Sequence, residues 1–238
     1  CHRSAWGRWS QVLKRNPDAV QVGLTATPRQ LTVTEETPET KKDLEVSADN
    51  LKHFGDPVYE YSLTQGIEDG YLAACEVQRG RVDIDDTGIA LEDILKRNPR
   101  DFRTGQPISA EELKELYEKT EYEDRIMLPD RVFAMCRDLF KYMLDSGGPE
   151  QKSIIFCVRD IHADLVATEM NNLYAEWCLK HGKPRCSSYA FKCTASVGGS
   201  DYLADLRGAS RSYFIATTVD LLTTGVDVPV VRNIVFFK

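Results

Sequence analysis

The sequence predicts an α/β fold in which parallel β-sheets are flanked by helices. Three short apolar runs, at 154–158, 212–216 and 233–237, have the length and continuous hydrophobicity of strands that are buried on both faces. An amphipathic helical pattern over 162–177 follows the first of these runs and precedes the other two. A strand, a helix and a second strand in this order form the βαβ unit of a parallel sheet, with a right-handed crossover.

Residues 1–76 are predicted to form the last part of one α/β lobe. The apolar run at 20–24 predicts a strand, and Pro28, which has no amide hydrogen, ends it. Gly70 is the expected stop of a later helix. The other predicted elements are a helix over 5–16, a polar mobile loop over 33–43, a strand over 58–61 and a helix that begins near Leu63.

Residues 77–124 are predicted to form a charged connector with one strand and one helix. Ser109 and Glu112 have the spacing of a capping box, with Ser109 as the N-cap and Glu112 at the third helical position. Two interpretations stay open for this segment. It is either a surface insertion or an interlobe linker that hinges when a ligand binds.

Residues 125–238 are predicted to form a second α/β lobe. The segment 131–144 is expected to be an amphipathic helix closed by Gly147 and Gly148. Its inward stripe consists of Val132, Met135, Cys136, Leu139, Phe140 and Met143. The helix over 162–177 is expected to turn Ala163, Val166, Ala167, Met170, Leu173 and Trp177 inward.

Composition indicates a globular protein of the cytoplasm. With 238 residues, of which 42% are hydrophobic and 28% charged, the chain can bury one large or two modest cores. No run of eighteen apolar residues and no leader pattern occurs, so neither a membrane protein nor a secreted one is expected. The seven cysteines form an odd and scattered set, which favours reduced thiols over a disulfide framework.

The net charge of −7 argues against nucleic-acid binding by bulk attraction, because non-specific affinity comes mainly from cationic contacts to phosphates. A local basic track remains compatible with this charge, although cations at such a density also form ordinary solvated surfaces. The candidates are Arg159, Lys180, Lys183, Arg185, Arg207 and Arg211.

A polar run at 216–229, Ala-Thr-Thr-Val-Asp-Leu-Leu-Thr-Thr-Gly-Val-Asp-Val-Pro, follows a predicted strand. In open parallel sheets, ligands bind beyond the carboxyl ends of the strands, so these hydroxyls, the glycine and Asp227 are placed for ligand contacts. A second run, Thr-Ala-Thr-Pro at 25–28, repeats the arrangement of a strand followed by threonines. Taken alone, the second run is also compatible with a plain strand cap.

Together, the runs at 25–28 and 216–229 resemble motifs III and V of the superfamily two helicases and DNA translocases. The resemblance is closer to the restriction and translocation subunit of type I restriction enzymes. Four segments in register carry it: 1–4, 23–28, 61–72 and 222–229. It spans most of the chain and is weakest between 81 and 124. It implies RecA-like lobes, with the end of the first motor lobe in 1–76 and most of the second in 125–238.

The resemblance implies a motor that hydrolyses ATP and moves duplex DNA. His2, in a segment similar to the end of an Asp-Glu-x-His box, would sense the γ-phosphate. Thr25 and Thr27 would couple hydrolysis to lobe closure. Gly225 would allow close backbone approach, and Asp227 would contact the nucleotide or an arginine across the cleft.

The same resemblance implies contacts to DNA. Thr218, Thr223 and Thr224 are the implied hydroxyl contacts in the motif V run. The segment 154–160 is similar to motif IV, which runs beside the DNA backbone, and this favours Arg159 among the basic candidates.

Three parts of such a motor do not occur in the sequence. They are a phosphate-binding loop of the G-x-x-x-x-G-K-[ST] type, the Asp-Glu pair that holds magnesium, and the closing arginine motif. We therefore expect a fragment of a longer motor that cannot hydrolyse ATP by itself, with ATP and Mg²⁺ as cofactors of the whole protein. The implied partners are double-stranded DNA and the methylation and specificity subunits, and no membrane is implied.

Two other functions stay open: a different superfamily two motor, and a non-catalytic α/β module that binds nucleic acid. A zinc site is a further alternative, because Cys178, His181, Cys186 and Cys193 lie close in sequence, although their spacing matches no familiar zinc pattern. His162 is either a surface histidine or a neighbour of the predicted DNA track.

Overall fold

The computed structural model describes residues 11, 14–15, 18–24, 54–80, 90–118, 125–195, 199–219, 221–222 and 226–237. The chain separates into two compact units, Cys1–Val77 and Gln78–Lys238. The predicted loop over 33–43 lies outside the described residues, as do most residues of the predicted helix over 5–16. The placement of the predicted lobe boundaries stays a prediction.

The first unit contains the short helix α3 (Leu63–Glu68). The side chain of Ser62 caps its start by accepting a hydrogen bond from the backbone N–H of Gln65 at 3.1 Å. Gly70 lies just beyond its end with a φ of 78°, a left-handed conformation in which glycine avoids the strain of a Cβ atom. The predicted helix and its glycine stop are therefore confirmed.

The two strands predicted in the first unit are not present as strands. Residues 20–24 and 58–61 have no regular secondary structure. Val22 is 83% exposed and Val58 is 100% exposed. A strand is stabilised by hydrogen bonds to a neighbouring strand, and within the described residues of this unit no such neighbour pairs with either run. Apolar pattern alone was therefore an insufficient signal.

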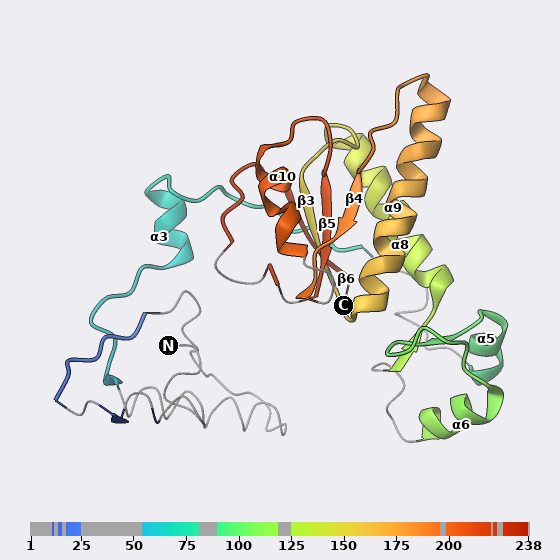
Figure 1. The fold of residues 1–238 in the computed structure, drawn as a ribbon, viewed down its shortest axis with the longest axis horizontal. Coiled ribbons are helices and arrows are strands. Elements are labelled where there is room, and N and C mark those ends of the chain that lie inside the picture. Colours follow the sequence, from blue (N-terminus) through green and yellow to red (C-terminus); the bar gives the residue numbers. More distant parts are fainter. Residues whose placement is uncertain are drawn as a thin grey trace. The chain divides into compact units, whose positions relative to one another are not determined.

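The second unit is built on a four-stranded parallel sheet (Figure 1). Its strands are β3 (Ser153–Cys157), β4 (Ala190–Lys192), β5 (Ile215–Thr218) and β6 (Asn233–Phe237), in the order β4-β5-β3-β6. All three ladders are parallel, which confirms the predicted fold class. β5 begins three residues later than the predicted 212–216 and includes Thr217 and Thr218.

Helices cover both faces of this sheet. The long helices α8 (Pro129–Asp145) and α9 (Asp160–His181) lie on one face, and η3 (Gly199–Tyr202) and α10 (Leu203–Gly208) lie on the other (Figure 1). Side chains of β3 alternate between the two cores: Ile155 packs in the α8–α9 core and Ile154 in the α10 core. Both predicted long helices are confirmed, and α9 extends to the left-handed Gly182 that caps it.

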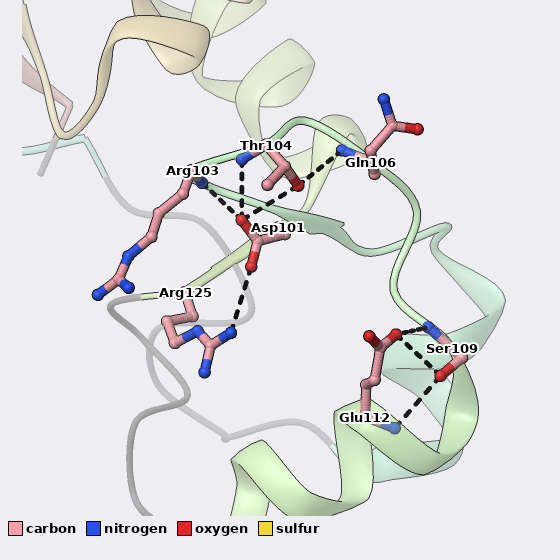
Figure 2. A network of polar contacts seen from close by, with 7 residues as sticks. All are labelled: Asp101, Arg103, Thr104, Gln106, Ser109, Glu112 and Arg125. Carbon is pink, nitrogen blue, oxygen red and sulfur yellow. Dashed lines mark hydrogen bonds and ion pairs between the residues drawn. The ribbon is translucent and has the colours of Figure 1, made fainter.

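A small helical subdomain precedes α8 in the chain. It contains α5 (Leu91–Lys96), β1 (Arg100–Asp101), α6 (Ala110–Glu118) and β2 (Ile126–Met127), and β1 pairs antiparallel with β2. The predicted capping box is confirmed at the start of α6. The carboxylate of Glu112 accepts a hydrogen bond from the Ser109 backbone N–H at 3.0 Å, and the Glu112 N–H donates to the Ser109 hydroxyl at 3.3 Å (Figure 2). Ile94, Ile108, Leu113, Ile126 and Leu128 form its own core.

This subdomain packs against the N-terminal ends of α8 and α9. Phe102 is buried in the α8–α9 core, with its ring centroid 5.7 Å from that of His162. Its backbone N–H donates to the Arg125 carbonyl at 2.7 Å, and Arg97 forms an ion pair with Asp130 at 3.0 Å. The described part of the predicted connector thus belongs to the second unit, and its role as a surface insertion or an interlobe linker stays a prediction.

None of the helices described has the length and apolar character needed to cross a lipid bilayer.

We predict that Phe102→Ala lowers the free energy of unfolding by about 3 kcal/mol or more, because it removes a buried aromatic ring from the main core. Tyr142→Ala, on the outer side of α8, is the matched control, since its side chain is 39% exposed. Urea unfolding followed by circular dichroism measures both variants. Equal small losses in the two variants would mean that the insertion does not contribute to the core.

Candidate functional site

The candidate site is the edge of the sheet at which the strands end. Because β3, β4 and β5 are parallel, their carboxyl ends meet at one edge, which is where open α/β sheets bind ligands. Arg159 follows β3, Thr194 follows β4, and Thr218 is the last residue of β5. Polar side chains from three separate strands are thereby brought to one edge.

An ion-pair network fixes the start of α9 against the end of β4. The Lys192 ammonium donates to Asp160 at 2.9 Å and to Asp164 at 2.6 Å. The Thr194 hydroxyl donates to the second oxygen of Asp160 at 2.6 Å. Partial burial lowers the pKa of Lys192, but the hydrogen bonds to Asp164 and Asp160 outweigh it and hold that pKa above its ordinary value. Lys192 therefore stays charged and ties the two elements together.

His162 lies buried in the first turn of α9, with 2% of its surface exposed. Its Nδ1 accepts a hydrogen bond from the Val158 N–H at 3.3 Å, so the neutral ring carries its proton on Nε2. Nε2 is buried and has no hydrogen-bond partner among the described residues. Burial, followed by the charge of Arg131, lowers the pKa of His162 from 6.5 to about 4. The interpretation of His162 as a surface histidine was therefore wrong.

Two of the predicted DNA-binding residues carry buried polar atoms at this edge. Within the described part of the chain, Nε of Arg159 and Oγ1 of Thr218 have no hydrogen-bond partner. An unpaired buried polar atom costs on the order of 1–3 kcal/mol, so such atoms are few in folded proteins and often lie at functional sites. Arg159 is half-buried, whereas Thr218 is fully buried. In this conformation Arg159 is therefore the better placed of the two for an external ligand.

Thr217 and Thr218 face opposite sides of the sheet. The Thr217 hydroxyl donates to the Ala163 carbonyl at 2.9 Å and so joins β5 to α9. Thr218 comes next in β5 and therefore faces the α10 side. Its side chain is fully buried in this conformation, and its role in DNA contact stays a prediction.

Asp227 is exposed beyond the end of β5. Its backbone carbonyl accepts a hydrogen bond from Nε of Arg207, on α10, at 2.6 Å. This contact joins the second part of the polar run at 216–229 to helix α10. The Asp227 side chain stays exposed to solvent. The predicted nucleotide contact of Asp227 stays a prediction.

The remaining predicted site residues lie outside the described part of the chain. They are His2, Thr25, Thr27, Thr223, Thr224 and Gly225.

The four soft side chains considered for zinc are not brought together. In the described residues, which include Cys178, His181, Cys186 and Cys193, no group of three or more His, Cys, Asp or Glu side chains has the arrangement of a metal site. His181 instead bonds the Trp177 carbonyl through Nδ1 at 2.8 Å.

Sequence reasoning missed Asp160, Lys192 and Thr194 as members of the site. Asp160 belonged to the segment matched to motif IV but received no role. Lys192 and Thr194 follow the short apolar run Tyr-Ala-Phe at 189–191, which forms most of β4. Polar residues directly after such a run were the signal that could have identified them.

The parallel sheet, its two helical layers and the polar carboxyl edge define this unit as a RecA-like α/β structure. No protein-family model matches the chain.

Comparison with known proteins shows which proteins this α/β chain is similar to. The chain is 31% identical over 241 residues to the type I restriction enzyme EcoAI endonuclease subunit of Escherichia coli, covering 99% of this chain and 26% of that protein. It is 28% identical over 235 residues to the EcoKI endonuclease subunit of Escherichia coli strain K12, covering 93% of this chain and 17% of that protein. A solved fragment assigned to the HsdR subunit of a type I restriction enzyme from Vibrio vulnificus YJ016 matches with a TM-score of 0.63 and 27% identity, over 97% of this chain and 35% of that one.

These findings confirm the resemblance predicted from the motifs. Over nearly its whole length, the chain is similar to a segment of the endonuclease subunit of type I restriction enzymes. It spans about a quarter of the EcoAI subunit and a smaller share of the EcoKI subunit.

We predict that stability falls as pH is lowered from about 6.5 towards 4 by about 3 kcal/mol through His162 alone. In this window the unfolded chain binds a proton at His162 while the folded chain keeps the ring neutral, so protonation favours unfolding. Urea unfolding at a series of pH values measures the slope.

His162→Asn keeps a hydrogen-bond acceptor near the Nδ1 position. It should remove the part of the dependence of unfolding free energy on pH that comes from His162. A variant with the same slope as the original chain would show that His162 protonates equally in both states.

Proposed function

We propose that this chain is part of the ATP-dependent DNA translocase motor of a type I restriction system. The observation that carries the proposal is the similarity to the EcoAI endonuclease subunit over 99% of the chain. It also favours this system over other superfamily two motors.

The geometry of the carboxyl edge supports a motor lobe. Arg159 comes directly after the central strand β3, and its guanidinium is the kind of planar donor that binds phosphate. The Asp160–Lys192 pair holds the backbone around Arg159 in place. Asp227 lies beyond the adjacent strand β5, on the polar run that resembles motif V. Arg159 would thus supply a phosphate-binding cation at the carboxyl edge, and Asp227 would supply a carboxylate from the segment between β5 and β6.

ATP and Mg²⁺ are the proposed cofactors. ATP hydrolysis would supply the free energy for movement along DNA. The exposed Asp227 carboxylate fits the proposed contact at the lobe surface, since it is polar and unobstructed, whereas the sequence holds no phosphate-binding loop. The described residues also hold no cluster of acids or histidines suited to a metal ion, so we assign no Mg²⁺ ligand among them.

The proposed partners are double-stranded DNA and the methylation and specificity subunits of the complex. We further propose a cytoplasmic location, which fits the six described cysteines, all of them free thiols. A non-catalytic module that binds nucleic acid is the competing function.

Asp227→Ala is predicted to abolish DNA-stimulated ATP turnover in the complete product of the gene that encodes this chain, because it removes the carboxylate proposed to contact the nucleotide. Asp145→Ala, an exposed position at the end of α8, is the matched control. Phosphate release measures turnover, and circular dichroism checks folding. Normal turnover in a folded Asp227→Ala variant would exclude this role.

Arg159→Ala is predicted to weaken DNA binding more at low salt than at high salt, since each lost phosphate contact lowers the salt slope by about 0.9. Fluorescence anisotropy with a labelled duplex measures affinity. Arg137→Ala, on the exposed side of α8, is the control. If the variant lost the same fraction of its DNA affinity at every salt concentration, a phosphate contact by Arg159 would be contradicted.

A further inference from the structure

The subdomain that precedes α8 carries a dense run of positive charge on the described surface. Residues 96–103, Lys-Arg-Asn-Pro-Arg-Asp-Phe-Arg, place four cations and a single acid within eight positions, in a chain whose net charge is −7. We call this segment the basic loop. The motif comparison assigned it no function, because it lies where the resemblance is weakest.

The basic loop forms one wall of a groove against α8 and α9. The groove has a volume of about 680 Å³. Lys96, Arg97 and Arg100 line it from the loop. Its apolar lining includes Phe133 of α8 and Ile161 and Leu165 of α9. The groove thus combines a cationic wall with an apolar floor.

Each of the two carboxylates that line the groove pairs with a cation, and Asp164 shares its partner Lys192 with Asp160. Asp130 pairs with Arg97 at 3.0 Å, and Asp164 pairs with Lys192 at 2.6 Å. Lys96 pairs with Asp93, but both side chains are more than half exposed, so this pair is weak. The positive charge that remains comes from the loop itself.

Two arginines of the loop are free to bind an anion. Arg100 is exposed, and its Nη1 donates to the Gly105 carbonyl at 3.2 Å, which leaves its other N–H groups available. The exposed side chain of Arg103 points away from Asp101, while its backbone N–H donates to that carboxylate at 2.7 Å (Figure 2). Both guanidinium groups therefore present their planar donors outward.

Internal bonds hold the loop in one shape. Asp101 accepts from the Thr104 N–H at 2.9 Å and pairs with Arg125 at 3.6 Å. Partial burial raises the pKa of Asp101, but the bonds from Thr104 and Arg103 and the charge of Arg125 outweigh it and hold that pKa below its ordinary value. Gly105 has a φ of 69°, and a Cβ atom there would lie 3.2 Å from the Ile161 side chain, so the loop closes tightly on α9. A site that is ordered in advance loses less entropy on binding.

The groove shares the start of α9 with the candidate site. Ile161 lines the groove and lies two residues after Arg159, at the start of α9. Asp164 of the groove belongs to the same ion-pair network as Lys192 and Asp160. A strand that contacts Arg159 at the carboxyl edge would therefore pass toward the basic loop.

We propose that the groove between the basic loop and the first turns of α8 and α9 binds the sugar–phosphate backbone of one DNA strand. Arg100 contacts phosphates from the wall of the groove, the exposed Arg103 of the same loop adds a second phosphate contact beside the groove, and the apolar floor packs against the sugars. The cations paired with Asp130 and Asp164 reduce the repulsion that would oppose a polyanion. This inference rests on the proposed function, and it extends the DNA contact from Arg159 to an insertion that the motifs do not describe.

The test compares two double variants by fluorescence anisotropy with a labelled duplex, at salt concentrations from about 50 to 200 mM. Arg100→Ala with Arg103→Ala should weaken binding by about tenfold at the lowest salt and lower the salt slope by about 1.8, since two phosphate contacts are lost. Arg137→Ala with Lys141→Ala removes the same charge from the outer side of α8 and should leave the slope nearly unchanged. Thermal unfolding checks that both variants are folded.

The outcomes separate the two proposals. If Arg159→Ala lowers the slope while the loop variant does not, the groove proposal fails and the proposed function stands. If the complete gene product without either change shows no salt-dependent DNA binding, both fail. If the loop variant binds DNA normally but loses affinity for polyglutamate, the groove is a site for an acidic protein segment and the DNA proposal is overturned.

Discussion

The parallel pairing of β3 with its two neighbours is the constraint on which the rest of the second unit depends. All five residues of β3 are buried, and the strand pairs with β5 on one side and β6 on the other. Its alternating side chains supply both hydrophobic cores, so α8 and α9 are held on one face and α10 on the other. The same parallel arrangement places Arg159 at the edge where β4 and β5 also end. Core packing and site formation therefore have one cause.

At that edge, polar groups are either held in an ion-pair network or left without a hydrogen-bond partner among the described residues. Lys192 forms ion pairs with Asp160 and Asp164, and these pairs fix the start of α9. Nε of Arg159 lies beside this network without a partner in the described residues. Leaving such an atom unpaired is unfavourable for folding alone. The unpaired Arg159 Nε is explained if this edge binds phosphate. The basic loop, which we propose also binds phosphate, lies in the adjacent subdomain.

Much of the second unit could be predicted from the sequence, because its strands are apolar runs and its helices have regular apolar stripes. The capping box at Ser109 could also be predicted, because both of its hydrogen bonds join residues three apart in the sequence. The failures have a common physical origin. The runs at 20–24 and 58–61 look like strands, but a strand depends on a partner that local sequence does not reveal. The burial of His162 was missed because Phe102, which covers it, lies sixty residues earlier in the chain. The basic loop was missed because no motif resemblance covers it.

We propose that this RecA-like unit works in an ATPase that DNA stimulates, and not as a static binding module. The most direct measurement is the rate of ATP hydrolysis by the complete product of the gene, with and without duplex DNA. The account predicts that duplex DNA stimulates hydrolysis. A rate that stays at background in the presence of DNA that the protein binds would contradict it and would favour a module that binds nucleic acid without turnover.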